Sequence, residues 1–294
     1  MSTSLIREAD VSPHKATNVT QSPRSRRRFS ALGHKRVLLG LAVVLAVHLS
    51  ACGTASQPAT PAGAGNSPGG AAITVLAAAS LTEAFSQIGK GFEAKNPGTT
   101  VTFSFGSSAT LATQVVQGAP ADVFAAASPA TMKIVSDASA AEPPMNFASN
   151  TLEIAVLNDN PHRIVGLQDF ADDGKRIALC APQVPCGAAA VKVFTAAKIT
   201  PKPDTLEQDV KATLQKVASD EVDAALVYQT DIIAAGDQVD GIKFAEAQQA
   251  INTYPIAVLK SSQNSAEAKA FVDYVLSLEG QAVLRKAGFA NPDP

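Results

Sequence analysis

The sequence predicts a two-lobed α/β protein, and three observations lead to this fold class. From residue 73 onward, apolar segments of strand length alternate with segments of helical periodicity. The connections between them are short, which is typical of a parallel sheet covered by helices on both faces. Two similar extended segments that each begin with Asn-Thr, residues 150–161 and 252–260, bracket the middle of the chain. We expect the chain to leave one lobe and return to it through these segments, which form the hinge beside a ligand cleft.

The first lobe is predicted to begin with a buried strand, because residues 73–78 form an unbroken apolar run. The next strand alternates apolar and polar residues, and Pro129 suits the first turn of a helix. In chain order the predicted elements are a strand at 73–78, a helix at 81–95, a strand at 99–105, a helix at 109–117, a strand at 121–128 and a helix from 129.

The remaining elements alternate in the same way, and the two Asn-Thr segments set the predicted domain boundaries. After the strand at 150–161 we expect a short helix at 167–170, a strand at 176–180, helices at 188–198 and 209–219, a strand at 223–228 and a short helix at 230–235. The returning strand at 252–260 precedes amphipathic helices at 265–277 and 279–287. One lobe is predicted to hold residues 72–149 and 252–294, and the other residues 150–251.

Residues 1–51 predict an export signal. A basic segment at residues 25–36 precedes an apolar run at 37–49 that is too short to span a membrane comfortably. The run ends in LSAC, which resembles a bacterial lipobox with cleavage before Cys52 and attachment of diacylglycerol to its thiol. An ordinary signal with an unrelated cysteine is the alternative, and the sequence SRRRF fits either twin-arginine export or a generic basic region. We expect residues 52–71 to be the lipidated cysteine and a flexible linker, and the protein to be lipid-anchored on the extracytoplasmic face of the cell membrane.

Charge is distributed unevenly along the chain. Residues 1–52 carry eight Lys and Arg against two acidic residues, which leaves 16 basic and 24 acidic residues in the remainder, a net charge of −8. An acidic body without Trp lacks the basic surface that nucleic-acid binding requires. We therefore expect no nucleic-acid partner.

Two cysteines and one histidine limit the chemistry of the mature chain. Cys180 and Cys186 lie six positions apart, outside the cytosol, which favours a disulfide worth about 2 kcal/mol for so small a ring. The alternative, a metal site, would need further soft ligands, and His162 is the only histidine after Cys52. We expect no catalytic residues, no cofactor and no direct metal ligands.

Candidate binding residues lie where predicted strands end and helices begin, the edge at which open α/β sheets bind ligands. They are Ser80, Ser107, Ser108, Cys186, Gly187, Asp209, Val210 and Tyr228. Ser and Asp also serve as helix N-caps, worth about 1 kcal/mol each, and a single Tyr is more often a packing residue. Taken together, several helix N-termini with added hydroxyls predict a site for a small anion that needs no Lys or Arg.

A serine hydrolase is the alternative from another functional class. It requires a base beside the nucleophile, whereas His162 lies in a polar loop and no G-x-S-x-G surrounds Ser80 or Ser108. The sequence also contains no P-loop motif and no dinucleotide-binding motif after a strand. We therefore expect a binding protein.

Six motifs in order resemble those of the molybdate-binding lipoproteins of bacterial ABC importers: AAASLTEAF, FGSSATLA, GAPADVFAAAS, VPCG, DVKATLQKV and ALVYQTD. The similarity extends over residues 73–290. It implies a periplasmic-binding-protein fold of type II, whose two lobes close over one molybdate or tungstate ion in the cleft between them. It also implies delivery of the ion to the ABC permease in the membrane, and we expect a monomer.

The resemblance implies five ligands: Ser80, Ser108, Cys186, Val210 and Tyr228. The two serines would donate from the first lobe, Cys186 and Val210 through backbone N–H groups of the second lobe, and Tyr228 through its phenol. Members of the family often have another small residue at the position of Cys186, and a bridge from it to Cys180 would pre-organise the loop. A receptor for sulfate or another tetrahedral oxyanion is the alternative within this class.

Overall fold

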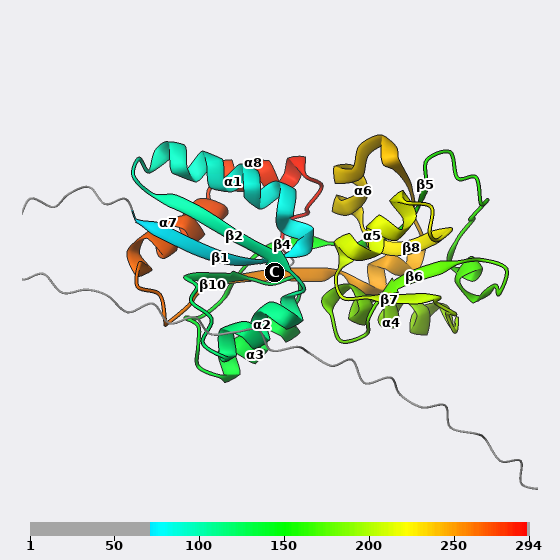
Figure 1. Ribbon diagram of the computed structural model, residues 1–294, viewed down its shortest axis with the longest axis horizontal. Coiled ribbons are helices and arrows are strands. Elements are labelled where there is room, and N and C mark those ends of the chain that lie inside the picture. Colours follow the sequence, from blue (N-terminus) through cyan, green and yellow to red (C-terminus); the bar gives the residue numbers. More distant parts are fainter. Residues whose placement is uncertain (1–70, 293–294) are drawn as a thin grey trace, which may run out of the picture. The chain divides into compact units, whose positions relative to one another are not determined.

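The computed structural model describes residues 71–292, which form two five-stranded sheets with helices packed against them (Figure 1). The predicted signal peptide, Cys52 and nearly all of the predicted linker lie outside the described residues. Each sheet contains both parallel and antiparallel pairs. The α/β class and the two-lobed organisation that the sequence predicts are confirmed, whereas the expectation of parallel sheets is wrong because β10 and β5 pair antiparallel with their neighbours.

The first sheet combines strands from both ends of the described chain in the order β2-β1-β3-β10-β4. Its strands are β1 (Ala72–Ala78), β2 (Thr100–Gly106), β3 (Val123–Ala125), β4 (Met145–Asn150) and β10 (Asn252–Val258). β1 pairs in parallel with β2 and β3, whereas β10 is antiparallel to β3 and β4. The carboxyl ends of β1, β2 and β3 therefore lie at one edge of this sheet.

Helices cover both faces of the first sheet because side chains alternate along its strands. Ile73, Val75 and Ala77 of β1 pack in one cluster with α1 (Thr82–Lys95), α7 (Ser265–Leu276) and α8 (Leu278–Lys286). Leu76 points the other way and packs with α2 (Ser108–Val116) and α3 (Pro129–Asp137). Figure 1 shows α1 and α8 above the sheet and α2 and α3 below it.

The second sheet has the order β7-β6-β8-β5-β9. Its strands are β5 (Leu152–Leu157), β6 (Ile177–Cys180), β7 (Thr205–Glu207), β8 (Ala224–Tyr228) and β9 (Val239–Ile242). The helices of this part are α4 (Pro185–Ala197), α5 (Val210–Ala218) and α6 (Gln229–Ala235). Four short 3₁₀ segments, η1 (Ala79–Leu81), η2 (Leu167–Ala171), η3 (Gly236–Gln238) and η4 (Ala245–Ala250), complete the described elements.

The strand predicted at 150–161 is wrong as a single element. The structure divides this region between β4, which ends at Asn150, and β5, which begins at Leu152, so the chain passes from one sheet to the other at Thr151. Asn150 pairs with Asn252 at the start of the returning strand. The two places at which the chain changes sheets are thus adjacent in space, although they are far apart in sequence.

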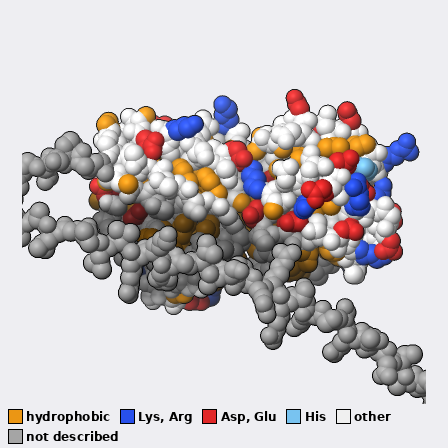
Figure 2. All heavy atoms as spheres, viewed as in Figure 1, with side chains coloured by type: hydrophobic (Ala, Val, Ile, Leu, Met, Phe, Trp, Pro, Cys, Tyr) orange, Lys and Arg blue, Asp and Glu red, His pale blue; other side chains and the backbone are white. Residues whose placement is uncertain are grey.

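On the visible part of the face in Figure 2, acidic and basic side chains are intermingled. Within residues 71–292, no helix is both long and apolar enough to cross a membrane.

Candidate functional site

A pocket of about 230 Å³ lies between the ends of the two sheets. All five ligands implied by the family resemblance line it: Ser80, Ser108, Cys186, Val210 and Tyr228. Of the other three candidates, Ser107 and Asp209 line it and Gly187 does not. The lining residues, all within the described range, include no Lys or Arg. The pocket is much smaller than the sites that proteins use for organic ligands, so it suits a small ion.

Three helices begin at the pocket: α2 with Ser108, α4 with Pro185 and α5 with Val210. The first N–H groups of a helix have no carbonyl partner within it, so those of Ser108, Cys186 and Val210 can donate to a ligand, and the helix dipoles favour an anion there. The predicted start of α4 at residue 188 is wrong. Proline lacks the N–H that would be unpaired at the first helical position, so Pro185 begins the helix and Cys186 lies in its first turn.

α4 approaches the end of β6 closely at Gly187. A Cβ atom at this position would collide with the backbone carbonyl of Ala181 and would lie 2.7 Å from the carbonyl oxygen of Cys180. Glycine is therefore required for the first turn of α4 to rest against the strand end. This packing sets the position of the Cys186 N–H group.

Two hydroxyls of the pocket accept a hydrogen bond from the protein and keep their own hydrogen for a ligand. The backbone N–H of Ala127 donates to Ser108 Oγ at 3.0 Å. The side-chain amide of Asn252 donates to the phenol oxygen of Tyr228 at 2.6 Å and to the carbonyl of Ala127 at 2.8 Å. A hydroxyl has one donor hydrogen and two acceptor sites, so each of these contacts leaves the hydrogen of Ser108 or Tyr228 unused.

The phenol of Tyr228 stays protonated at neutral pH. Its side chain is fully buried, and burial, with smaller contributions from Tyr254 and Asp231, raises its pKa well above the ordinary value of 10.0. Tyr228 can therefore act as a hydrogen-bond donor to an anion.

Ser80 lies in the η1 turn between β1 and α1, and its hydroxyl does not cap α1. Ser80 Oγ instead lies 2.9 Å from the phenol oxygen of Tyr254, which in turn accepts from the amide of Asn150 at 3.4 Å. Either hydroxyl can donate in the contact between Ser80 and Tyr254. When Tyr254 donates, the hydrogen of Ser80 is left for the pocket.

The residues that orient these hydroxyls were not among the candidates from the sequence. They are Asn150, Asn252, Tyr254 and Ala127. The sequence does mark the two asparagines, since each begins one of the repeated Asn-Thr segments, but the pattern indicates only strands. Their role depends on contacts with residues distant in the chain.

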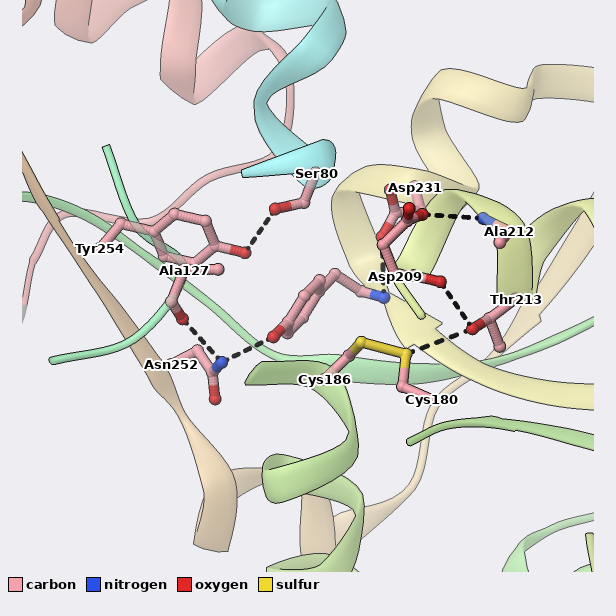
Figure 3. Close-up of a disulfide and its surroundings, with 11 residues drawn as sticks. Ser80, Ala127, Cys180, Cys186, Asp209, Ala212, Thr213, Asp231, Asn252 and Tyr254 are labelled. Carbon is pink, nitrogen blue, oxygen red and sulfur yellow. Dashed lines mark hydrogen bonds between the residues drawn. A yellow bond between two sulfur atoms is a disulfide. The ribbon is translucent and has the colours of Figure 1, made fainter. Parts of the chain in front are cut away.

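A disulfide joins Cys180 at the end of β6 to Cys186 in the first turn of α4 (Figure 3). The Sγ atom of Cys180 lies 3.2 Å from Thr213 Oγ1, which donates to the carbonyl of Asp209. Asp209 is the N-cap of α5, as the sequence predicts, and its carboxylate accepts from the N–H of Ala212. The disulfide thus joins the first turn of α4 to the end of β6 and contacts α5 through Thr213.

An ion-pair group lies beside the pocket, and Asp231 is its one fully buried member. Lys211, the residue after Val210, places its Nζ 2.9 Å from Glu83 Oε2 on α1 and 3.2 Å from Asp231 Oδ1 on α6. Burial raises the pKa of Asp231 from the ordinary value of 3.8 to about 6, although Lys211 partly offsets this effect. Burial lowers the pKa of Lys211, but its two acidic neighbours outweigh burial and raise it overall. Lys211 therefore stays charged and connects a helix of the first sheet to helices of the second.

His162 lies away from the pocket. Its Nε2 is 2.8 Å from Asp220 Oδ1 and its Nδ1 is 3.4 Å from Asp223 Oδ1. Asp223 directly precedes β8 and Tyr228 ends that strand, so the histidine and the pocket lie at opposite ends of β8. Among the residues that the structure describes, no group of three or more His, Cys, Asp and Glu side chains could hold a metal ion.

Comparisons with known proteins agree with this arrangement. The chain is 41% identical over 253 residues to the molybdate-binding protein ModA of Mycobacterium tuberculosis H37Rv, covering 86% of this chain and 96% of that protein. Its fold is similar to that of the periplasmic molybdate-binding protein of Azotobacter vinelandii, with a TM-score of 0.64, 23% identity and coverage of 75% of this chain and 100% of that one. The sulfate-binding protein SubI of M. tuberculosis H37Rv shares the fold with a TM-score of 0.66, 19% identity and coverage of 76% and 88%. Residues 73–290 match the model of the bacterial extracellular solute-binding proteins, and the chain belongs to this family.

Proposed function

We propose that this protein binds molybdate outside the cytoplasm and delivers it to the permease of an ABC importer. The observation that carries the proposal is a small pocket in which hydroxyl and backbone N–H donors from both sheets converge without Lys or Arg. Helix N-termini and neutral donors can satisfy the oxygens of a tetrahedral dianion. The relative from M. tuberculosis, similar over nearly its whole length, is a molybdate-binding protein.

A pocket of donors favours a fully deprotonated anion. Monohydrogen phosphate would require an acceptor for its proton. Asp209 is the one carboxylate that lines the pocket, and its Oδ1 already accepts from the N–H of Ala212. Molybdate, tungstate and sulfate remain, and we propose tungstate as a second ligand because it is a tetrahedral dianion of the same kind.

We assign ligand roles to the five pocket residues. Ser80, Ser108 and Tyr228 would donate through their hydroxyls, and Cys186 and Val210 through backbone N–H groups. The contacts that occupy the hydroxyl oxygens of Ser108 and Tyr228 support this assignment, because they leave the hydrogens of these two residues for the ion. No coordination of the molybdenum atom by protein atoms is involved.

The two sheets would act as lobes that open and close around the ion. We propose residues 72–149 with 252–294 as the first lobe and 150–251 as the second, joined by a hinge where Asn150 and Asn252 pair. Closure of such a hinge would bring the donors of both lobes onto one ion. We further propose a monomer held at the extracytoplasmic face of the cell membrane through lipid on Cys52.

We infer that the protein is not an enzyme and binds no nucleic acid. Hydrolysis by Ser80 or Ser108 would need a base within hydrogen-bond reach, whereas His162 contacts Asp220 at the other end of β8. The intermingled charges in Figure 2 and the acidic body support the absence of a nucleic-acid partner. A phosphonofluoridate that labels a serine stoichiometrically would contradict the first inference.

Titration calorimetry of the mature protein tests the function. We expect molybdate and tungstate to bind tightly, and sulfate and phosphate to bind weakly or not at all. A thermal-shift series should agree, since a ligand at about a thousand times its Kd stabilises the folded state by about 4 kcal/mol. Equal responses to molybdate and sulfate, or none to molybdate, would contradict the proposal and favour a receptor for another oxyanion.

A further inference from the structure

We propose that the side-chain hydroxyl of Ser107 is an additional ligand for the tetrahedral oxyanion. Ser107 lines the pocket, and its side chain is buried, with 8% of the residue exposed. Its Oγ is fully enclosed and has no hydrogen-bond partner among residues 71–292. A buried hydroxyl without a partner is rare in folded proteins because it loses its bonds to water. An anion in the pocket would supply the missing acceptor.

The position of Ser107 makes its lack of a partner more informative. It is the N-cap residue of α2, where a serine normally accepts from an N–H of the first turn, yet its side chain makes no such bond. By contrast, the side chains of Ser128 at α3 and Ser277 at α8 each accept from a backbone N–H in the first turn of their helix. Ser277 caps with a φ of −68° and a ψ of 166°, whereas Ser107 has a φ of −58° and a ψ of 126°. The hydroxyl of Ser107 is therefore left for the pocket.

The hydroxyl of Ser107 differs from those of Ser108 and Tyr228 because no protein donor restricts its orientation. Ser108 and Tyr228 have an oxygen occupied by a protein donor, which restricts the direction of their hydrogens. Ser107 has no such contact, so its hydrogen can turn toward whichever oxygen of the ion is nearest. We infer that the hydroxyl of Ser107 adjusts to ions of different size, whereas the hydroxyls of Ser108 and Tyr228 fix the position of the ion.

The inference rests on the proposed function, and titration calorimetry of Ser107→Ala and Ser107→Gly with molybdate tests it. Both variants should bind molybdate about 10- to 100-fold more weakly than the wild type, the effect of losing a hydrogen bond to a charged group. The melting temperature of Ser107→Ala without molybdate should not fall below that of the wild type, because the hydroxyl makes no bond within the protein and its burial without a partner is unfavourable.

Ser128→Ala is the matched control, since it removes a serine that does cap its helix. Its melting temperature should fall by about 2–4 °C and its affinity for molybdate should not change. Wild-type affinity in both Ser107 variants would overturn the inference and leave the proposed function intact. A lower melting temperature with unchanged affinity would overturn it as well, and would identify Ser107 as a structural residue. A wild-type protein that binds no molybdate would overturn both.

Discussion

The disulfide between Cys180 and Cys186 should stabilise both the fold and the anion pocket, and these two effects can be measured separately. Its sequence separation is six, for which the chain-entropy model gives about 2 kcal/mol. Replacement of both cysteines by alanine should therefore lower the melting temperature by about 4–8 °C for a domain of this size. Alanine introduces no new polar group next to Thr213, whose hydroxyl keeps its bond to the carbonyl of Asp209.

The effect on the pocket follows from the position of Cys186 in the first turn of α4. Without the disulfide this turn is held by fewer contacts, and its N–H groups must be ordered when the ion binds. Ordering the backbone of one residue costs about 1–2 kcal/mol. The affinity for molybdate should therefore fall about 5- to 30-fold.

Titration calorimetry and urea unfolding of the wild type and the double alanine variant measure the two effects. A mild reductant should lower the stability of the wild type and leave that of the variant unchanged, which controls for the cavities that the missing sulfur atoms create. A variant that is less stable but binds molybdate with wild-type affinity would refute pre-organisation of the pocket. Unchanged stability would refute the loop-entropy reasoning itself.

Three further substitutions test other parts of the site. Ser108→Ala should weaken molybdate binding about 10- to 100-fold. It should also lower the free energy of unfolding by about 1 kcal/mol, because the N–H of Ala127 loses its acceptor. Calorimetry measures the first effect and urea unfolding the second, and a loss of stability with unchanged affinity would give Ser108 a structural role only. Glu83→Gln should weaken binding about 2- to 5-fold at low salt and less at high salt, because Glu83 pairs with Lys211 across the two sheets. Affinities measured at two salt concentrations test this, and a loss independent of salt would contradict it. Burial raises the pKa of Asp231 from 3.8 to about 6, so ionisation of this carboxyl destabilises the folded protein. This destabilisation is absent below about pH 4, grows as the pH rises and is complete above about pH 6. The free energy of unfolding of Asp231→Asn should therefore rise by about 2–3 kcal/mol relative to that of the wild type as the pH increases through this range. Urea unfolding at several pH values measures this difference, and no increase, or a decrease with pH, would contradict the reasoning.

Most of the fold follows from local sequence pattern. The helices and the longer strands have clear periodicity, and the cap at Asp209 was predicted from the residue type alone. The strands β4, β7 and β9 were not predicted. β7 and β9 have only three and four residues, and β4 contains several polar residues, so pairing with neighbouring strands decides their conformation more than their own pattern does.

The sequence by itself determined which chemical groups the pocket contains. Small residues, serines and helix N-termini at the ends of strands are local features, and they point to neutral donors. The tertiary structure alone decided which protein donors occupy the oxygens of these hydroxyls. Asn252 lies 24 positions from Tyr228, and Ala127 lies 19 from Ser108. No local pattern records such contacts, because hydrogen bonds between distant residues form only when the packed sheets bring them together.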